Sequence, residues 1–155
     1  MRILAVDPGD RWGTAEYIDG VVWLLEGRMR GRSPADKKRR LAELLRLEAY
    51  GDTDYPFDLL LLERPVPPGP GRSVLGTISL AMTAGVWAGV CACAELEIVT
   101  PSSWNTKGTG AMRAEKMLQK FEVRCGPDAK SALGLLLWKL RELGEDVGSV
   151  HGTEA

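Results

Sequence analysis

The sequence contains few of the nitrogen and sulfur side chains that enzymes and metal sites most often use. Its 155 residues include one histidine, His151, and three cysteines, Cys91, Cys93 and Cys125. The cysteines are odd in number and lack metal-ligand spacing, which indicates reduced thiols in a cytosolic protein. His151 stands near the end of the chain, where we expect a frayed tail. We therefore expect no disulfide framework, no zinc site and no catalytic histidine.

Asparagine and glutamine are also nearly absent, with Asn105 and Gln119 the only examples. Together with many arginines and glutamates, this depletion of thermolabile side chains indicates a host that grows at high temperature. No signal peptide is expected, because Met1-Arg2 leads directly into an apolar run. The sequence therefore predicts a cytoplasmic protein.

Charge is absent from Val74–Ala94, a stretch about as long as a membrane span. Glycine, alanine, serine and threonine make this stretch only weakly hydrophobic, and its flanks carry no strong basic anchor. We therefore predict a helix in the core or at a subunit interface, and no membrane association. Gly85 and Gly89 have the small-xxx-small spacing that allows close helix contact, which indicates a homodimer interface.

The overall composition is 45% hydrophobic and 26% charged with a net charge of −1, which is typical of one globular domain. The charge is unevenly distributed: basic residues outnumber acids from Arg28 to Arg46, and the segment after Glu142 is acidic. A solvated helix face and a nucleic-acid contact surface both explain the basic run. Its candidate DNA contacts are Lys37, Lys38, Arg39 and Arg40.

Two short apolar runs each end in an acid. Ile3–Val6 has no polar residue, which predicts a strand buried on both faces, and it is followed by Asp7 and a Pro-Gly turn. Phe57–Leu62 repeats the pattern and is followed by Glu63. Because ligands bind beyond the carboxyl ends of strands in open α/β sheets, we expect both carboxylates at one binding edge.

The remaining elements follow from periodicity and turn signals. Asp19-Gly20 predicts a hairpin between strands Thr14–Ile18 and Val21–Leu25. The predicted order is three strands, helix, strand, helix, strand and two helices, an α/β domain with a mixed five-stranded sheet. The domain spans residues 1–144, and residues 145–155 are expected to form a flexible acidic tail. The other predicted elements are a helix from Pro34 to Ala49, the uncharged helix 74–94, a strand Glu97–Thr100, a loop Pro101–Gly110, and helices Ala111–Phe121 and Asp128–Leu143.

A third acid, Asp128, stands in the first turn of the last predicted helix. A helix-end charge alone explains an acid there, since the macrodipole favours it. Buried carboxylates at two strand ends repel one another, however, and a divalent cation relieves that cost. Oxygen-only ligands indicate Mg²⁺ or Mn²⁺, which in turn indicates hydrolysis of a phosphodiester.

The motifs together resemble the RuvC-type Holliday junction resolvases, which have the RNase H-like fold. The resemblance rests on ILAVDPGDRWGTA at the first strand, LLLLERP at the fourth and Asp128–Leu133 in the last helix. Pro101-Ser102, Lys107, Gly108, Gly110, Ala114 and Lys116 resemble that family's basic Gly-x-Gly-x-Ala-x-Lys segment. The small size and the composition resemble a bacteriophage-encoded member.

This resemblance implies a crossover junction endonuclease. Asp7, Glu63 and Asp128 would be metal ligands for Mg²⁺ or Mn²⁺, with two ions per active site. A homodimer would cut a four-way DNA junction by paired symmetric nicks, without a nucleotide cofactor. The expected DNA contacts outside the first helix are Arg72, Lys107, Arg113 and Lys116.

The sequence departs from the family pattern at two places. Ser131 stands where the family has a fourth acid, and a hydroxyl is a weaker Mg²⁺ ligand than a carboxylate, so Ser131 is a candidate catalytic position with reduced activity. The loop after Glu63, PVPPGPGR, has no aromatic wedge, which leaves Val66, the prolines or Arg72 for that role. A non-catalytic junction-binding module and a nuclease for other branched DNA or hybrids remain alternatives. A sugar-kinase or actin-like protein is disfavoured, because the chain is short and lacks a second glycine-rich phosphate loop.

Overall fold

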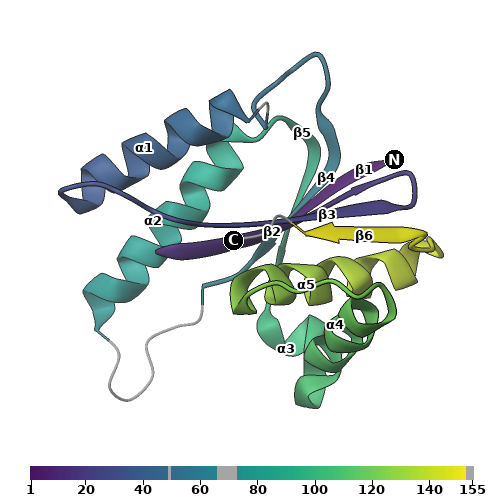
Figure 1. Ribbon diagram of the computed structural model, residues 1–155. Helices are drawn as coiled ribbons and strands as arrows, with labels where there is room; N and C mark the ends of the chain where they lie inside the picture. Colours follow the sequence, from purple (N-terminus) through teal and green to yellow (C-terminus); the bar gives the residue numbers. More distant parts are fainter. Residues whose placement is uncertain (49, 66–72, 153–155) are drawn as a thin grey trace.

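The computed structural model describes residues 1–48, 50–65 and 73–152, and these form a mixed six-stranded sheet with helices on both faces (Figure 1). The strand order is β5-β4-β1-β2-β3-β6. The strands are β1 (Arg2–Asp7), β2 (Arg11–Ile18), β3 (Val21–Arg28), β4 (Phe57–Glu63), β5 (Cys93–Val99) and β6 (Ser149–Gly152). The helices are α1 (Pro34–Leu47), α2 (Val74–Val90), α3 (Pro101–Trp104), α4 (Thr109–Lys120) and α5 (Pro127–Leu143), with a 3₁₀ turn at Thr106–Gly108.

The first three strands form an antiparallel meander, as the sequence predicts. Asp19 and Gly20 both have positive φ, 45° and 93°, and this conformation matches the right-handed twist of the hairpin strands. Strand β4 runs parallel to β1, and β5 runs parallel to β4. Strands β1 and β4 therefore end at the same edge of the sheet, which we call the carboxylate edge.

Side chains alternate between two hydrophobic cores, one on each face. Ile3 and Ala5 of β1 pack in the core under α5, whereas Leu4 and Val6 pack in the core under α1 and α2. Figure 1 shows α1 and α2 on one side of the sheet and α4 and α5 on the other. Because successive strand residues point to opposite faces, Asp7 continues the row of Ile3 and Ala5 toward α5. The same alternation along β4 directs Glu63 toward α5, because Leu61 packs in that core.

The predicted helix ends are confirmed where a cap encodes them. The Ser33 hydroxyl accepts a hydrogen bond from the Asp36 amide at 3.1 Å, and Pro34 occupies the first helical position of α1. Helix α5 ends at Gly144, whose φ of 70° is the left-handed conformation that glycine tolerates best.

The sheet has six strands, not the five that the sequence predicts. Residues 149–152 of the expected tail form β6, which pairs in parallel with β3. Val150 is buried in the core under α5, and the Gly148 amide donates to the Gly20 carbonyl at 2.7 Å. A four-residue strand after an acidic stretch has no local signature, because the unpaired edge of β3 supplies its hydrogen bonds.

The uncharged helix is shorter and more exposed than predicted. Helix α2 ends at Val90, and Cys93 begins β5 opposite Phe57, so the end of the apolar run is a strand. Of the residues of α2, only Thr83 and Trp87 are buried, so α2 does not lie in the core, and the subunit interface stays a prediction. In the part of the chain that the structure describes, no helix combines the length and hydropathy needed to cross a membrane.

The segment predicted as the loop Pro101–Gly110 also contains regular structure. Trp104 at the end of α3 is buried, and its ring lies where a Cβ on Gly110 or Gly134 would stand, at 2.5 and 2.6 Å. The two glycines therefore allow the indole to pack between α4 and α5.

Candidate active site

The carboxylate edge brings Asp7 and Glu63 onto neighbouring parallel strands, both directed toward α5. Burial, followed by the nearby charge of Asp128, raises the pKa of Asp7 to about 6. Burial likewise raises the pKa of Glu63 to about 7, with a second contribution from Asp7. The charge of Asp7 therefore disfavours the charged form of Glu63, and the charge of Asp128 disfavours that of Asp7.

Asp128 reaches this edge because Gly13 allows α5 to approach the sheet. Gly13 pairs with Asp7 in the β1–β2 ladder, and a Cβ on Gly13 would lie only 2.1 Å from the backbone carbonyl carbon of Asp128. Any larger residue at position 13 would push the first turn of α5 away. Gly13 was part of the first-strand motif, but its role in this approach was not evident from the sequence.

Ser131, one turn after Asp128, also faces the acids. Its hydroxyl lies near enough to the Asp7 carboxylate to lower the pKa of Asp7, which partly offsets the effect of burial. The position that carries a fourth acid in the resembled family is thus directed at the site, but it contributes a neutral donor instead of a fourth negative charge.

The donor set fits a hard divalent cation in its chemistry. Among the residues that the structure describes, no three acidic, histidine or cysteine side chains converge closely enough to enclose a metal ion. Asp7, Glu63 and Asp128 nevertheless supply only oxygen donors, and their pKa values are all raised. A divalent cation prefers such donors and would relieve the repulsion that raises these pKa values.

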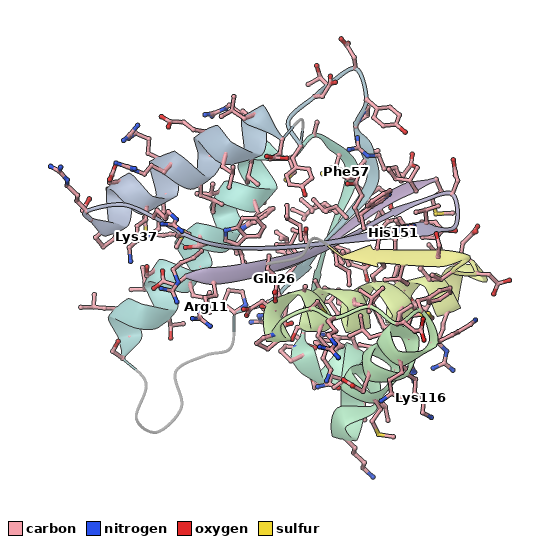
Figure 2. All side chains as sticks on the ribbon, viewed as in Figure 1. Arg11, Glu26, Lys37, Phe57, Lys116 and His151 are labelled. Carbon is pink, nitrogen blue, oxygen red and sulfur yellow. The ribbon has the colours of Figure 1, made fainter. Side chains whose placement is uncertain are left out.

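Two charged residues at the edge were missed by the sequence reasoning. Glu26 of β3 accepts hydrogen bonds from the Gly126 and Ala129 amides, both at 2.9 Å. Burial raises the pKa of Asp128, Glu26 raises it further, and Arg11 opposes the shift. Figure 2 shows Arg11 and Glu26 near the start of α5. Their only sequence signal is strand alternation, which places Leu24 and Glu26 on one face, but the face cannot be assigned without the pairing register.

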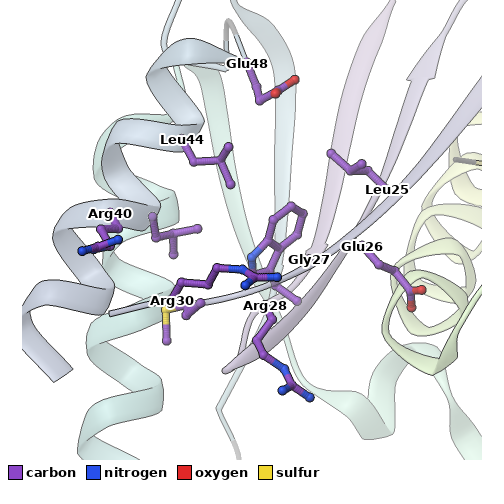
Figure 3. A pocket seen from close by; sticks show the side chains of 11 residues that line it. Leu25, Glu26, Gly27, Arg28, Arg30, Arg40, Leu44 and Glu48 are labelled. Atoms are coloured by element: carbon purple, nitrogen blue, oxygen red, sulfur yellow. The ribbon is translucent and has the colours of Figure 1, made fainter. Parts of the chain in front are cut away.

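Basic side chains surround two cavities next to the carboxylate edge. Arg11 and Arg28 are register partners on β2 and β3. One cavity, of about 390 Å³, is lined by Asp10, Arg11, Arg28, Met29 and Lys37. A second, of about 490 Å³, lies between β3 and α1 (Figure 3). Arg28 and Arg30 border this second cavity from one side and Arg40 borders it from α1, so cations line both walls.

The predicted basic residues of α1 differ in their freedom to bind an anion. Arg39 pairs with Asp36 at 2.6 Å and with Glu43 at 2.7 Å, and Arg40 pairs with Asp36 at 3.1 Å. Lys38 donates to the Ser79 hydroxyl of α2 at 3.3 Å, whereas Lys37 lies 3.9 Å from Asp10 at the edge of the sheet. Part of the basic run thus has local partners, which agrees with a solvated helix face, and Lys37 is the member that approaches Asp10.

The remaining predicted contacts lie elsewhere or outside the described residues. Arg113 and Lys116 line a cavity of about 410 Å³ with Leu137 and Leu140, more than two helical turns along α5 from Asp128. Lys116 is correspondingly distant from Arg11 and Glu26 in Figure 2. Lys107 is exposed, with a left-handed φ of 51°. The predicted contact Arg72 and the predicted wedge of Val66 and the neighbouring prolines lie outside the described residues.

The mixed sheet with helices on both faces is similar to known solved structures. The structure of Thermus thermophilus RuvC is similar with a TM-score of 0.63 at 14% identity, covering 93% of this chain and 97% of that chain. T. thermophilus RuvC in complex with a Holliday junction substrate gives a TM-score of 0.65 at 13% identity, covering 93% and 96%. The yeast mitochondrial Holliday junction resolvase Ydc2 gives 0.59 at 14% identity, covering 92% and 80%. No family model and no curated protein matches the sequence. The chain therefore has the fold of RuvC-type resolvases, as the motifs predict.

Proposed function

We propose that this protein is a metal-dependent endonuclease that resolves four-way DNA junctions. The observation that carries the proposal is the meeting of Asp7, Glu63 and Asp128 at one sheet edge, in the fold of RuvC and Ydc2. RuvC was solved in complex with a Holliday junction substrate, and Ydc2 is a Holliday junction resolvase. Repulsion among neighbouring acids does not stabilise a fold, so cation binding is the most direct explanation for their position.

Asp7, Glu63 and Asp128 would hold Mg²⁺ or Mn²⁺, with two ions per site as the family resemblance implies. The bound cation would polarise the scissile phosphate and acidify a water molecule. A cation would favour the charged forms of Asp7 and Glu63, whose pKa values burial and a neighbouring acid raise to about 6 and about 7. Ser131 favours the charged form of Asp7 and adds no negative charge.

The cations beside the carboxylate edge would bind the phosphate backbone. Arg11 and Arg28 stand at the end of the β2–β3 hairpin, and Lys37 lines the same cavity. Contacts to phosphates position a nucleic acid without reading its sequence. Arg40 and Arg30, around the adjoining cavity, would extend this surface along α1.

A homodimer would use the exposed apolar face of α2. Ile78 is 49% exposed and Met82 is 57% exposed. A Cβ on Gly85 or Gly89 would have nothing within 4 Å, so this glycine stripe is open to a second helix. Leu96 and Ile98 of the edge strand β5 are exposed on the same face of the sheet, since they pair with Leu60 and Leu62. A two-fold dimer suits a four-way junction, because two symmetric nicks need two symmetric sites.

The decisive experiment compares a labelled four-way junction with a duplex of equal length, each incubated with Mg²⁺, Mn²⁺ or EDTA. We expect symmetric nicks in the junction alone, which EDTA and Glu63→Gln abolish. Ser131→Asp would restore a fourth acid and is expected to cut faster than the natural chain. The phage origin, the hot-growing host and the cytoplasmic location stay predictions from composition and resemblance.

The alternatives give different results in the same assay. Tight junction binding without cleavage, even by Ser131→Asp, would leave a non-catalytic junction-binding module. Equal cutting of flaps, hybrids and junctions would indicate a less selective RNase H-like nuclease.

A further inference from the structure

Glu26 joins β3 to the first turn of α5 through both oxygens of one carboxylate. Oε2 accepts from the Gly126 amide and Oε1 accepts from the Ala129 amide, each at 2.9 Å. Leu24, two residues earlier on the same face, packs in the core under α5. Figure 3 shows Glu26 directed away from α1 and from Arg40. The two partners are about one hundred residues apart in the sequence, so only the tertiary fold brings them together.

Helix α5 depends on this contact because its own N-terminal residue cannot cap it. The N-cap position is Gly126, which has no side chain to accept a hydrogen bond. The carboxylate of Glu26 takes that role from a neighbouring strand, and its charge complements the positive end of the helix dipole. A Cβ at position 126 would lie 2.5 Å from Oε2 of Glu26, so the absence of a side chain there leaves room for the carboxylate.

The two amides held by Glu26 lie on either side of Asp128. Fixing the Gly126 and Ala129 amides fixes the backbone between them, and the direction of the Asp128 side chain depends on that backbone. Gly13 sets how closely the same turn approaches the sheet. The helix start is thus held from β2 by contact and from β3 by two charge-assisted hydrogen bonds.

We propose that Glu26 is the positioning residue that orients Asp128 for cation binding. The inference rests on the proposed function of the acid cluster. Its role is assigned through the backbone, because each of its two oxygens accepts a hydrogen bond from an amide beside Asp128. Outer partners of this kind typically change metal affinity about 10- to 100-fold when they are removed.

The test measures Mn²⁺ binding to the unliganded protein by titration calorimetry, without DNA. Glu26→Gln replaces one acceptor by a donor, and we expect it to weaken Mn²⁺ binding about tenfold or more. Glu145→Gln is the matched control: it removes a charged acceptor of the Tyr17 hydroxyl just beyond the other end of α5. This control is expected to bind Mn²⁺ within about twofold of the natural chain.

A second variant keeps the glutamate and displaces it. Gly126→Ala adds a Cβ that conflicts with Oε2 of Glu26, while the backbone of residue 126, with φ of −78°, accepts alanine. It is expected to weaken Mn²⁺ binding in the same direction as Glu26→Gln, and it decides the question if Glu26→Gln fails to fold. Junction binding in EDTA should stay within about twofold for both variants, because the phosphate contacts are unchanged.

Natural Mn²⁺ affinity in folded Glu26→Gln and Gly126→Ala would overturn the inference and leave Glu26 as a structural cap alone. The proposed function fails separately, if the natural chain binds no Mn²⁺ or if Asp128→Asn binds it equally well. Comparing the Glu26 variants with Asp128→Asn therefore distinguishes a lost positioning role from an absent metal site.

Discussion

Asp7 and Glu63 are acids whose ordinary charge is opposed by their surroundings. Each lies at the end of a buried strand, and burial is the main cause of its raised pKa, followed by the charge of its neighbour. A group that prefers its neutral form in the folded state makes folding less favourable once the solution pH removes its proton. The same feature that prepares the site for a cation therefore destabilises the cation-free protein at neutral and alkaline pH.

Glu63→Gln should reveal this cost. The stability that protonated Glu63 contributes is fully present below its ordinary pKa of 4.5 and is lost as pH rises through the folded value of about 7, whereas glutamine does not titrate. After discounting for partial solvent exposure, we expect the variant to be more stable by about 1–2 kcal/mol at pH 8 in EDTA. Urea denaturation at pH 8 and pH 4 measures the difference, which should vanish at pH 4.

The matched comparison is Glu115→Gln, which should change stability in the opposite direction. Lys130 lowers the pKa of Glu115, so this acid stabilises the folded state when it is charged, and its loss should destabilise the protein at pH 8. A Glu63→Gln variant that is less stable than the natural chain at pH 8 would contradict the role of repulsion at the carboxylate edge.

At the scale of single residues, the sequence predicted the positions of Asp7 and Glu63 better than those of the charged residues around them. Asp7 and Glu63 end conspicuous apolar runs, so their meeting follows from strand order alone. Arg11 and Glu26 lie within strands, and their relation to Asp128 depends on the register of β1, β2 and β3. Lys116 is an expected DNA contact from the resemblance, and the packing of α4 on α5 places it beside Leu137 and Leu140.

At the scale of elements, local signals were reliable and long-range pairing was not. The Asp19-Gly20 hairpin and the capped start of α1 were correctly predicted, because turn and cap residues encode them directly. Strand β6 and the early start of β5 were missed, because each forms by pairing with a strand distant in sequence. Sequence periodicity cannot report such hydrogen bonds.

Strand β6 should therefore contribute measurable stability. Val150 is 5% exposed and packs in the core under α5, so Val150→Ala should cost about 1–3 kcal/mol of unfolding free energy. Leu143→Ala is the comparison, since Leu143 is 44% exposed and its truncation should cost about 1 kcal/mol or less. Guanidinium denaturation with equal m-values would measure both. No change in Val150→Ala would indicate that residues 149–152 behave as a frayed tail in solution.

At the scale of the whole molecule, charge and apolar surface occupy different regions. The cations Arg11, Arg28 and Lys37 gather at the carboxylate edge, while exposed apolar residues gather on α2 and β5. One region suits a polyanion and the other suits a second protein surface. The net charge of −1 conceals this separation.

Junction binding should depend steeply on salt through the cationic region. Arg11→Gln and Arg28→Gln should each weaken binding and reduce the slope of log affinity against log salt by about 1, since each phosphate contact releases one condensed counterion. Fluorescence anisotropy in EDTA at several salt concentrations measures the slope. Lys139→Gln removes the same charge from a lysine paired with Glu97 at 2.7 Å, and it should leave the slope unchanged. Equal slopes in all four proteins would place the DNA elsewhere.

The apolar region should hold the dimer. The double variant Ile78→Glu, Met82→Glu introduces charge into the exposed face of α2 and is expected to sediment as a monomer. Leu47→Glu changes an 84% exposed leucine on α1 and should remain dimeric. Analytical ultracentrifugation at micromolar concentration distinguishes the two. A natural chain that is monomeric under these conditions would remove the basis for paired symmetric nicks by one dimer.

The Asp19-Gly20 turn lies at the end of the β2–β3 hairpin opposite Arg11 and Arg28, and it contacts both ends of the described chain. The Met1 amine pairs with Asp19 at 2.6 Å, and the Gly148 and Ser149 amides donate to the Gly20 carbonyl. A tether or dye attached near this turn would extend away from the carboxylate edge. A single-molecule experiment could therefore immobilise the protein near this turn and record the binding and dissociation of individual junctions at the carboxylate edge.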